Sequence, residues 1–279
     1  MWRELGGLHE PVVGIGPDHD LVTYWSARRA TGSTDAALTH TATGAKDDHS
    51  TVVVQQPPTD VSFAQPMPDG RFLLGAGRTQ DGRESNASVW DHEGTRIVEG
   101  NLGDAIAHVL ATPAGQIWIG YHDEANGPPS GPPSGIARFN PDLAESWRYR
   151  AGSGMPEHFD CYSLNVEDET ATSYAYADWH LTRISGNSWT DLGRAPHIGA
   201  HGLLVEDERA VLIGGYGADY DLLTPVVIDG DGVHPTGSPR RLVLPDGLEV
   251  IRAAKSFCRG PELHVIHYGT WYRLSLSDI

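Results

Sequence analysis

A four-strand unit recurs along this chain, and the repeat constrains the fold more than any other feature of the sequence. Its clearest copy reads AHVLATPAGQIWIGY followed by GIARFNPDLAESWRYR, which predicts strands over 107–112, 116–121, 135–139 and 145–150. A related copy lies upstream, with its turn at Pro68-Asp69-Gly70, and others follow downstream as far as residue 279. Short strands separated by turns and repeated every 40–50 residues are typical of propeller blades.

Six such units can be counted, of which the first, PVVGIGPDHDLVTYW, and the last, over 250–279, are partial. The lone segment from Trp2 to Gly6 matches the fourth strand of another unit, Trp189 to Gly193. We therefore predict a single domain over 1–279, an all-β six-bladed β-propeller of four-stranded antiparallel blades. The N-terminal strand would join the last blade and close the ring, which removes exposed sheet edges. An irregular β-sandwich and a seven-bladed ring are the alternatives.

Two insertions interrupt the repeat. Residues 30–50 are rich in Thr, Ala and Asp, and we expect an extended loop with a weak strand there. The segment GPPSGPPSG over 127–135 has the prolines of a stiff extended loop, which is either an inert connection or a rim to a binding face.

The charge balance excludes several classes of partner. Lys and Arg total 20 against 37 Asp and Glu, which gives a formal net charge of −17. Such a chain repels phosphate backbones and anionic lipid, so we expect neither a nucleic-acid nor a membrane partner. The N-terminus lacks the pattern of a signal peptide, and two cysteines, Cys161 and Cys258, are typical of buried thiols. These features together predict a cytoplasmic protein.

The third unit carries a resemblance to known families. Its segments Gly115 to Gly120 (GQIWIG) and Gly135 to Phe139 (GIARF) resemble blades of sensor-type and virginiamycin-lyase-like propellers. These are similar in turn to gluconolactonase-like and strictosidine-synthase-like six-bladed enzymes. The resemblance implies the fold and leaves the chemistry open, because propellers host unrelated functions.

In a propeller, the starts of the first strands and the ends of the second strands open on one face. We expect a small-molecule pocket there, because aromatic and convergent polar side chains gather at these positions. The residues expected to bind the ligand are Tyr24, Trp25, Phe63, Arg78, Tyr162, Tyr176, Arg252 and Tyr268. The residues expected to act in acid–base catalysis are His108, His122, His201, His267, Tyr121, Tyr216 and Asp160.

No nucleophile or nucleotide-binding motif is present, so we predict a non-redox enzyme of the lyase, cyclase or hydrolase type without an organic cofactor. A non-catalytic propeller that binds a small molecule, a glycan or a protein partner is the alternative.

Three histidines suggest a divalent metal as a further hypothesis. His9, His108 and His201 open first strands of alternate blades, which stand about 120° apart in a six-fold ring. Three imidazoles with an open fourth position would suit a catalytic zinc-type site. Without a metal, the same histidines would serve in proton transfer or substrate binding.

Overall fold

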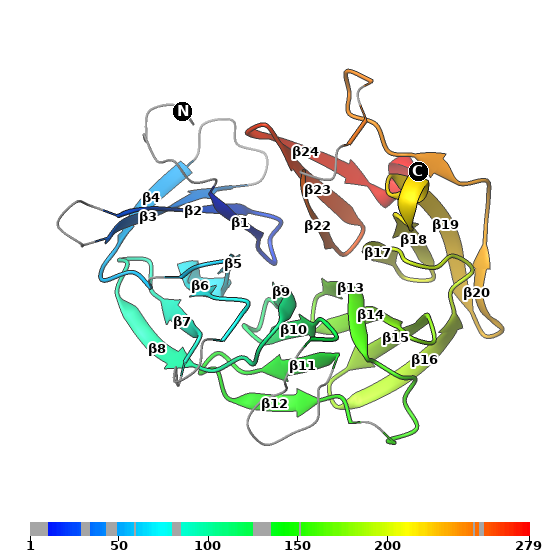
Figure 1. The fold of residues 1–279 in the computed structure, drawn as a ribbon, viewed down its shortest axis with the longest axis horizontal. Coiled ribbons are helices and arrows are strands. Elements are labelled where there is room, and N and C mark those ends of the chain that lie inside the picture. Colours follow the sequence, from blue (N-terminus) through cyan, green and yellow to red (C-terminus); the bar gives the residue numbers. More distant parts are fainter. Residues whose placement is uncertain are drawn as a thin grey trace. The chain divides into compact units, whose positions relative to one another are not determined.

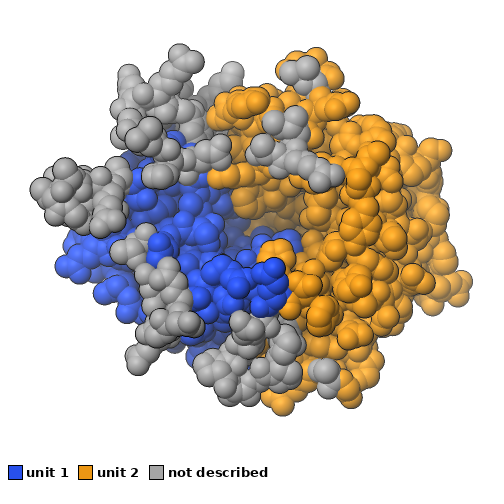
Figure 2. Space-filling view, in the orientation of Figure 1, with its two compact units in different colours: residues 1–119, 124–133, 137–147 blue, residues 120–123, 134–136, 148–279 orange. Residues whose placement is uncertain are grey.

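The computed structural model describes residues 11–28, 34–42, 49–58, 60–79, 85–124, 135–150, 152–247, 249–250 and 254–279. The chain divides into two compact units (Figure 2). Unit 1 comprises residues 1–119, 124–133 and 137–147, and unit 2 comprises residues 120–123, 134–136 and 148–279. The prediction of a single domain remains a prediction.

The first three sheets are four-stranded and antiparallel (Figure 1). The first consists of β1 (Val12–Ile15), β2 (Leu21–Arg28), β3 (Thr34–Thr41) and β4 (His49–Val54). The second consists of β5 (Phe63–Pro66), β6 (Phe72–Gly75), β7 (Ala87–Trp90) and β8 (Arg96–Gly100). The third consists of β9 (Ile106–Ala111), β10 (Ile117–Tyr121), β11 (Ile136–Phe139) and β12 (Glu145–Arg148).

The remaining three sheets belong to unit 2. The fourth consists of β13 (Asp160–Glu167), β14 (Thr170–Tyr176), β15 (His180–Ser185) and β16 (Ser188–Arg194). The fifth consists of β17 (Gly202–Glu206), β18 (Arg209–Ile213), β19 (Leu222–Asp229) and β20 (Gly232–Pro235), and the short β21 (Arg240–Arg241) also pairs with β19. The sixth consists of β22 (Lys255–Arg259), β23 (Glu262–His267) and β24 (Thr270–Ser275).

These sheets are the blades of an all-β six-bladed propeller, as the repeat predicted. Helical structure among the described residues is confined to three short 3-10 turns: η1 (Pro68–Gly70), η2 (Gly217–Asp219) and η3 (Leu276–Asp278). The first of these is the predicted hairpin turn, where Asp69 and Gly70 both have positive φ, 61° and 68°. Two successive residues of positive φ match the twist of the flanking strands.

The strand expected within residues 30–50 is present, whereas the expectation that the first unit is partial was wrong. Residues 34–41 form the full-length β3, and β4 begins at His49, so the first blade has all four strands. Leu38 is buried between Tyr24 on β2 and Val52 on β4. The alternation that marks β3 rests on small and polar residues around Leu38, and its hydrophobic signal is therefore weak.

Apolar side chains of adjacent strands form the core of each unit. In unit 1 the buried cluster includes Val22, Leu38 and Trp90, and in unit 2 it includes Leu181, Leu203 and Leu212. The predicted ring-closing strand over residues 1–6 and most of the insertion over 127–135 lie outside the described residues. In the described part of the chain, no helix has the length and hydrophobicity required to span a bilayer.

Candidate functional site

The first two strands of the fourth blade end at a group of aromatic side chains. β13 begins at Asp160, which pairs with Tyr176 at the end of β14. The register of this ladder shifts between Cys161 and Ser163, so Tyr162 is an extra residue in β13. A β-bulge of this kind bends the strand and re-aims a side chain. The Tyr162 ring consequently packs among the neighbouring aromatic rings.

We call five side chains of unit 2 the aromatic cluster: Phe159, Tyr162, Tyr176, Trp179 and Tyr216. Trp179 lies at its centre, with ring centroids 5.0 Å from Tyr162, 5.1 Å from Tyr176 and 6.2 Å from Tyr216. The corresponding interplanar angles are 86°, 79° and 83°, the edge-to-face arrangement that aromatic rings prefer. Trp179 is itself buried, whereas Tyr176 and Tyr216 are 40% and 52% exposed. The cluster therefore presents aromatic surface to solvent on a rigid base.

A hydrogen bond between two hydroxyl groups joins the fourth blade to the fifth. The Tyr162 and Tyr216 hydroxyl oxygens are 2.8 Å apart. Tyr216 follows β18 and lies directly over Gly199, where an added Cβ would come within 2.7 Å of the ring. Gly199 also has a φ of +78°, which glycine adopts without steric cost. The glycine thus leaves the room in which the Tyr216 ring reaches Tyr162.

The loop that carries Gly199 is held in place by a buried tyrosine. The Tyr174 hydroxyl donates to the carbonyl oxygen of His197 at 2.8 Å and accepts from the Gly199 backbone N–H at 3.1 Å. Its ring packs on Trp179, with centroids 5.4 Å apart. Tyr174 thereby connects the base of the aromatic cluster to the loop beneath Tyr216.

A carboxylate and an imidazole adjoin the cluster. The Asp160 side chain is mostly buried, and His122 Nδ1 lies 3.8 Å from its Oδ1. His122 follows β10, whose last residue, Tyr121, is buried with the Arg148 guanidinium 5.8 Å from its ring centroid. Tyr121 therefore contributes to packing, while Asp160 and His122 lie beside one another at the edge of the cluster.

The protonation of Tyr162 is set by its surroundings. Burial raises the pKa of Tyr162 well above its usual value, and the hydrogen bond and charges of Tyr216 and the charge of Asp160 raise it further. Burial likewise raises the pKa of Tyr174. Both phenols therefore stay protonated at neutral pH. Tyr162 can donate a hydrogen bond to a ligand oxygen but cannot serve as a base there.

Several of the residues predicted from the sequence come together at this place. They are His122, Asp160, Tyr162, Tyr176 and Tyr216, all in unit 2. His9 and Arg252 lie outside the described residues.

The predicted residues of unit 1 have other surroundings. Tyr24 is buried in the core, and burial raises its pKa to about 12 despite a hydrogen bond with Ser26. Trp25 donates its indole N–H to the Thr23 hydroxyl, 3.2 Å away. Phe63 packs against Gly75, whose added Cβ would lie 2.4 Å from the ring.

Arg78, also in unit 1, is an ion-pairing residue. Its guanidinium lies 2.7 Å from Glu124 and 3.4 Å from Asp104.

The remaining predicted histidines have separate environments. His201 stacks on Tyr220 with centroids 4.3 Å apart, and its Nε2 donates to the Tyr220 carbonyl oxygen at 2.9 Å. His267 contacts Tyr268, which is 88% exposed. His108 lies on β9 in unit 1. The metal hypothesis for His9, His108 and His201 stays a prediction.

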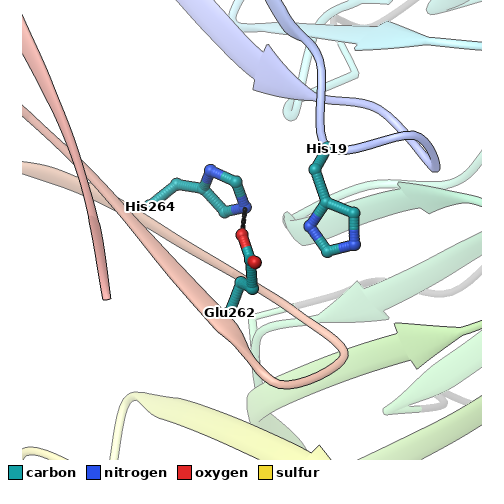
Figure 3. A group of neighbouring side chains, drawn as sticks. All are labelled: His19, Glu262 and His264. Atoms are coloured by element: carbon teal, nitrogen blue, oxygen red, sulfur yellow. Dashed lines mark ion pairs between the residues drawn. The ribbon is translucent and has the colours of Figure 1, made fainter. Parts of the chain in front are cut away.

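Another histidine, His264 on β23, belongs to a buried polar network. The Trp271 indole N–H donates to His264 Nδ1 at 3.1 Å, so the proton of the neutral imidazole lies on Nε2. This Nε2 faces Glu262, 3.8 Å away (Figure 3), and Glu262 also accepts from Arg273 at 2.9 Å. In that tautomer Nε2 lacks the lone pair that a metal ligand needs. The network is suited to fixing the sheet.

Sequence reasoning missed Phe159, Trp179 and Gly199. Trp179 comes three residues after Tyr176 and has a positive φ of 62°, so it turns back under the strand end. Gly199 sits in a Pro-His-Ile-Gly segment that reads only as a loop. A tryptophan three residues after a strand-end tyrosine was the available signal for the cluster.

Comparisons with known proteins found similar solved structures. Hsv2 of Kluyvelomyces marxianus is similar to this chain with a TM-score of 0.52 and 9% identity, over 96% of this chain and 77% of that one. A gluconolactonase of Xanthomonas campestris, XC5397, is similar with a TM-score of 0.46 and 12% identity, over 96% and 95%. The PQQ-bound aldose sugar dehydrogenase of Streptomyces coelicolor gives a TM-score of 0.49 and 12% identity, over 96% and 94%.

No family model matches the sequence, and no curated protein matches it either. The six antiparallel sheets define the class of this protein, the six-bladed β-propeller.

Proposed function

We propose that the aromatic cluster and Asp160 form the active site of a hydrolase that acts on the carbonyl group of a small organic molecule. The single observation that carries this proposal is the convergence of a carboxylate, a hydrogen-bonded hydroxyl pair and exposed aromatic rings on one strand end. Aromatic surface with a few convergent polar groups is the usual composition of a small-molecule site.

Each polar group has a role in the proposed reaction. The Asp160 carboxylate accepts a proton from water as the water oxygen bonds to the substrate carbonyl carbon. The Tyr162 and Tyr216 hydroxyls carry one proton each. One of these protons forms the hydrogen bond between the two hydroxyls, and the other forms a hydrogen bond to the developing oxyanion. As the carbon–oxygen bond to the leaving group breaks, the proton passes from Asp160 to the leaving alkoxide. His122 polarises Asp160 and keeps it oriented.

The protonated state of Tyr162 supports this assignment. A phenol whose pKa is raised remains a donor throughout the neutral range, as an oxyanion partner must be. The cysteines support a mechanism without a covalent intermediate. Burial raises the pKa of the Cys161 thiol far above its usual value and that of Cys258 to about 12, so neither forms a thiolate nucleophile at neutral pH.

The test uses the full chain with 4-nitrophenyl acetate as the probe. We expect hydrolysis above the buffer rate, a loss of about 100-fold or more in kcat for Asp160→Asn, and a loss of tenfold or more for Tyr162→Phe. Glu157→Gln removes an exposed carboxylate three residues from Asp160 and should leave kcat unchanged. Equal rates for Asp160→Asn and wild type would overturn the proposal.

A non-catalytic binding propeller is the second candidate, and the exposure of the rings favours it. Phe159, Tyr176 and Tyr216 are large apolar side chains open to solvent, and exposed patches of this kind mark interaction sites. For this candidate we expect ligand-dependent changes in tryptophan fluorescence, lost in Tyr216→Leu, without turnover of any probe.

A further inference from the structure

The ligand class of the aromatic cluster follows from its polar and aromatic surfaces taken together. Tyr162 and Tyr176 are nearly parallel, with an interplanar angle of 25° and centroids 6.2 Å apart. Tyr216 stands at 78° to Tyr162, with centroids 6.3 Å apart. Two ring directions therefore border the same exposed surface, and each ring face carries the negative end of its quadrupole.

A carboxylate lies at the edge of these rings. Asp160 is the direct ladder partner of Tyr176, and directly opposed residues place their side chains on the same face of the sheet. The charge of Asp160 reaches Tyr162 as well, because it contributes to the raised pKa of that phenol. A negative charge that disfavours the ionised phenolate of Tyr162 stabilises a cation in the same place.

The hydroxyl pair of this surface has little hydrogen-bonding capacity left for a ligand. Because Tyr162 and Tyr216 bond to one another, their two hydroxyls offer a single proton to a ligand. A polyhydroxylated ligand would need many more donors and acceptors to replace its water shell. A weakly hydrated ligand with one positive charge loses little on entering such a surface.

We propose that the ligand of the aromatic cluster is an organic cation, with its ammonium group over the exposed faces of Tyr176 and Tyr216 and beside the Asp160 carboxylate. This rests on the proposed function, since it names the substrate class of the same site. Aromatic faces attract a cation within roughly 6 Å of the ring centroid, and Trp and Tyr are the strongest partners. The formal net charge of −17 concentrates cations around the protein and raises their rate of encounter.

The experiment compares two probes that differ in charge alone. Choline and its neutral isostere 3,3-dimethyl-1-butanol are titrated into the full chain by calorimetry. We expect choline to bind at least about tenfold more tightly than the isostere. Asp160→Asn keeps the shape of the side chain. It should lower the affinity for choline several-fold and leave the affinity for the isostere unchanged.

Two further variants locate the bound choline. Tyr176→Leu and Tyr216→Leu each remove an exposed ring and should lower the choline affinity about tenfold. Val243→Ala removes an apolar side chain that is 52% exposed and lies outside the cluster, and should have no effect. Choline binding that is insensitive to both ring variants would overturn the proposal.

The outcome is distinguishable from failure of the proposed function. Equal affinity for choline and the isostere, or binding of glucose in place of choline, would overturn the proposal of a cationic ligand. The proposed active site would still stand if Asp160→Asn abolishes hydrolysis. If Asp160→Asn hydrolyses the probe as fast as wild type, the proposed active site is overturned, whether or not choline binds.

Discussion

Two tyrosines occupy corresponding places in different blades, and their surroundings differ. Tyr24 on β2 pairs with Val12 on β1, and Tyr176 on β14 pairs with Asp160 on β13. In each case the partner is the first residue of the blade's first strand. Yet Tyr24 is 2% exposed and Tyr176 is 40% exposed. The position along the blade therefore does not by itself decide whether a tyrosine is core or surface.

The third strand of each blade accounts for the difference. In the first blade β3 pairs with β2 along its whole length, so Leu38 lies opposite Tyr24 on the side away from Val12. In the fourth blade the pairing of β14 with β15 stops at Tyr174 and Leu181, two residues before Tyr176. Tyr176 thus lacks a strand partner on that side, and its ring rests on Trp179 instead. A shortened third strand is what opens aromatic surface at the fourth blade.

The largest effect expected from this comparison is on stability. Tyr24→Ala removes a buried ring from the core of unit 1 and should lower the free energy of unfolding by about 3–5 kcal/mol. Tyr176→Ala removes a half-exposed ring and should cost about 1 kcal/mol. Urea denaturation of the two variants against wild type measures both values. Equal losses would mean that the two tyrosines are equally buried in solution.

The sequence predicted the fold because the blade repeat is local. Turn signals such as Pro68-Asp69-Gly70 and the apolar strand around Trp118 depend on neighbouring residues, and both are confirmed. β3 was expected only as a weak strand because its inward-facing residues are Ala36 and Leu38, a small side chain and a single large one. The weak signal of β3 also concealed the cover over Tyr24, which was expected on the binding face.

The candidate site could be predicted in part. Asp160, Tyr176 and Tyr216 stand at strand ends, which the repeat locates, and the structure places them near one another. The bulge at Tyr162 and the space above Gly199 depend on contacts between distant segments, which no local pattern encodes. Their role in catalysis or binding stays a prediction until the variants are measured.

A second prediction concerns acid stability beneath the cluster. His158 is buried two residues before Asp160, where its Nδ1 donates to the Pro156 carbonyl oxygen and its Nε2 accepts from the Ser173 hydroxyl. Burial lowers the pKa of His158 from 6.5 to about 4. The unfolded chain therefore binds more protons between these values, and stability present above pH 6.5 is lost as the pH falls toward 4. The loss should reach about 3 kcal/mol.

The measurement is the free energy of unfolding in wild type and His158→Gln at pH 7 and pH 4.5. The variant lacks the titrating group, so its loss between the two pH values should be smaller by roughly 2–3 kcal/mol. His234→Gln, which changes a half-exposed histidine of β20, should retain the wild-type difference. A His158→Gln profile parallel to wild type would show that His158 does not titrate on unfolding.

The smallest expected effect separates the position of Tyr216 from backbone strain. Gly199→Ala introduces a Cβ within 2.7 Å of the Tyr216 ring at a φ of +78°, and should cost about 1–2 kcal/mol in strain while displacing the ring. Gly217→Ala has a φ of +62° with nothing within 4 Å of its Cβ, so it carries similar strain without the displacement. Calorimetric unfolding should give comparable losses for the two variants. The affinity for choline should fall in Gly199→Ala alone, because only that variant separates the Tyr216 hydroxyl from Tyr162. An equal fall in both variants would mean that the position of the Tyr216 ring over Gly199 does not determine choline binding.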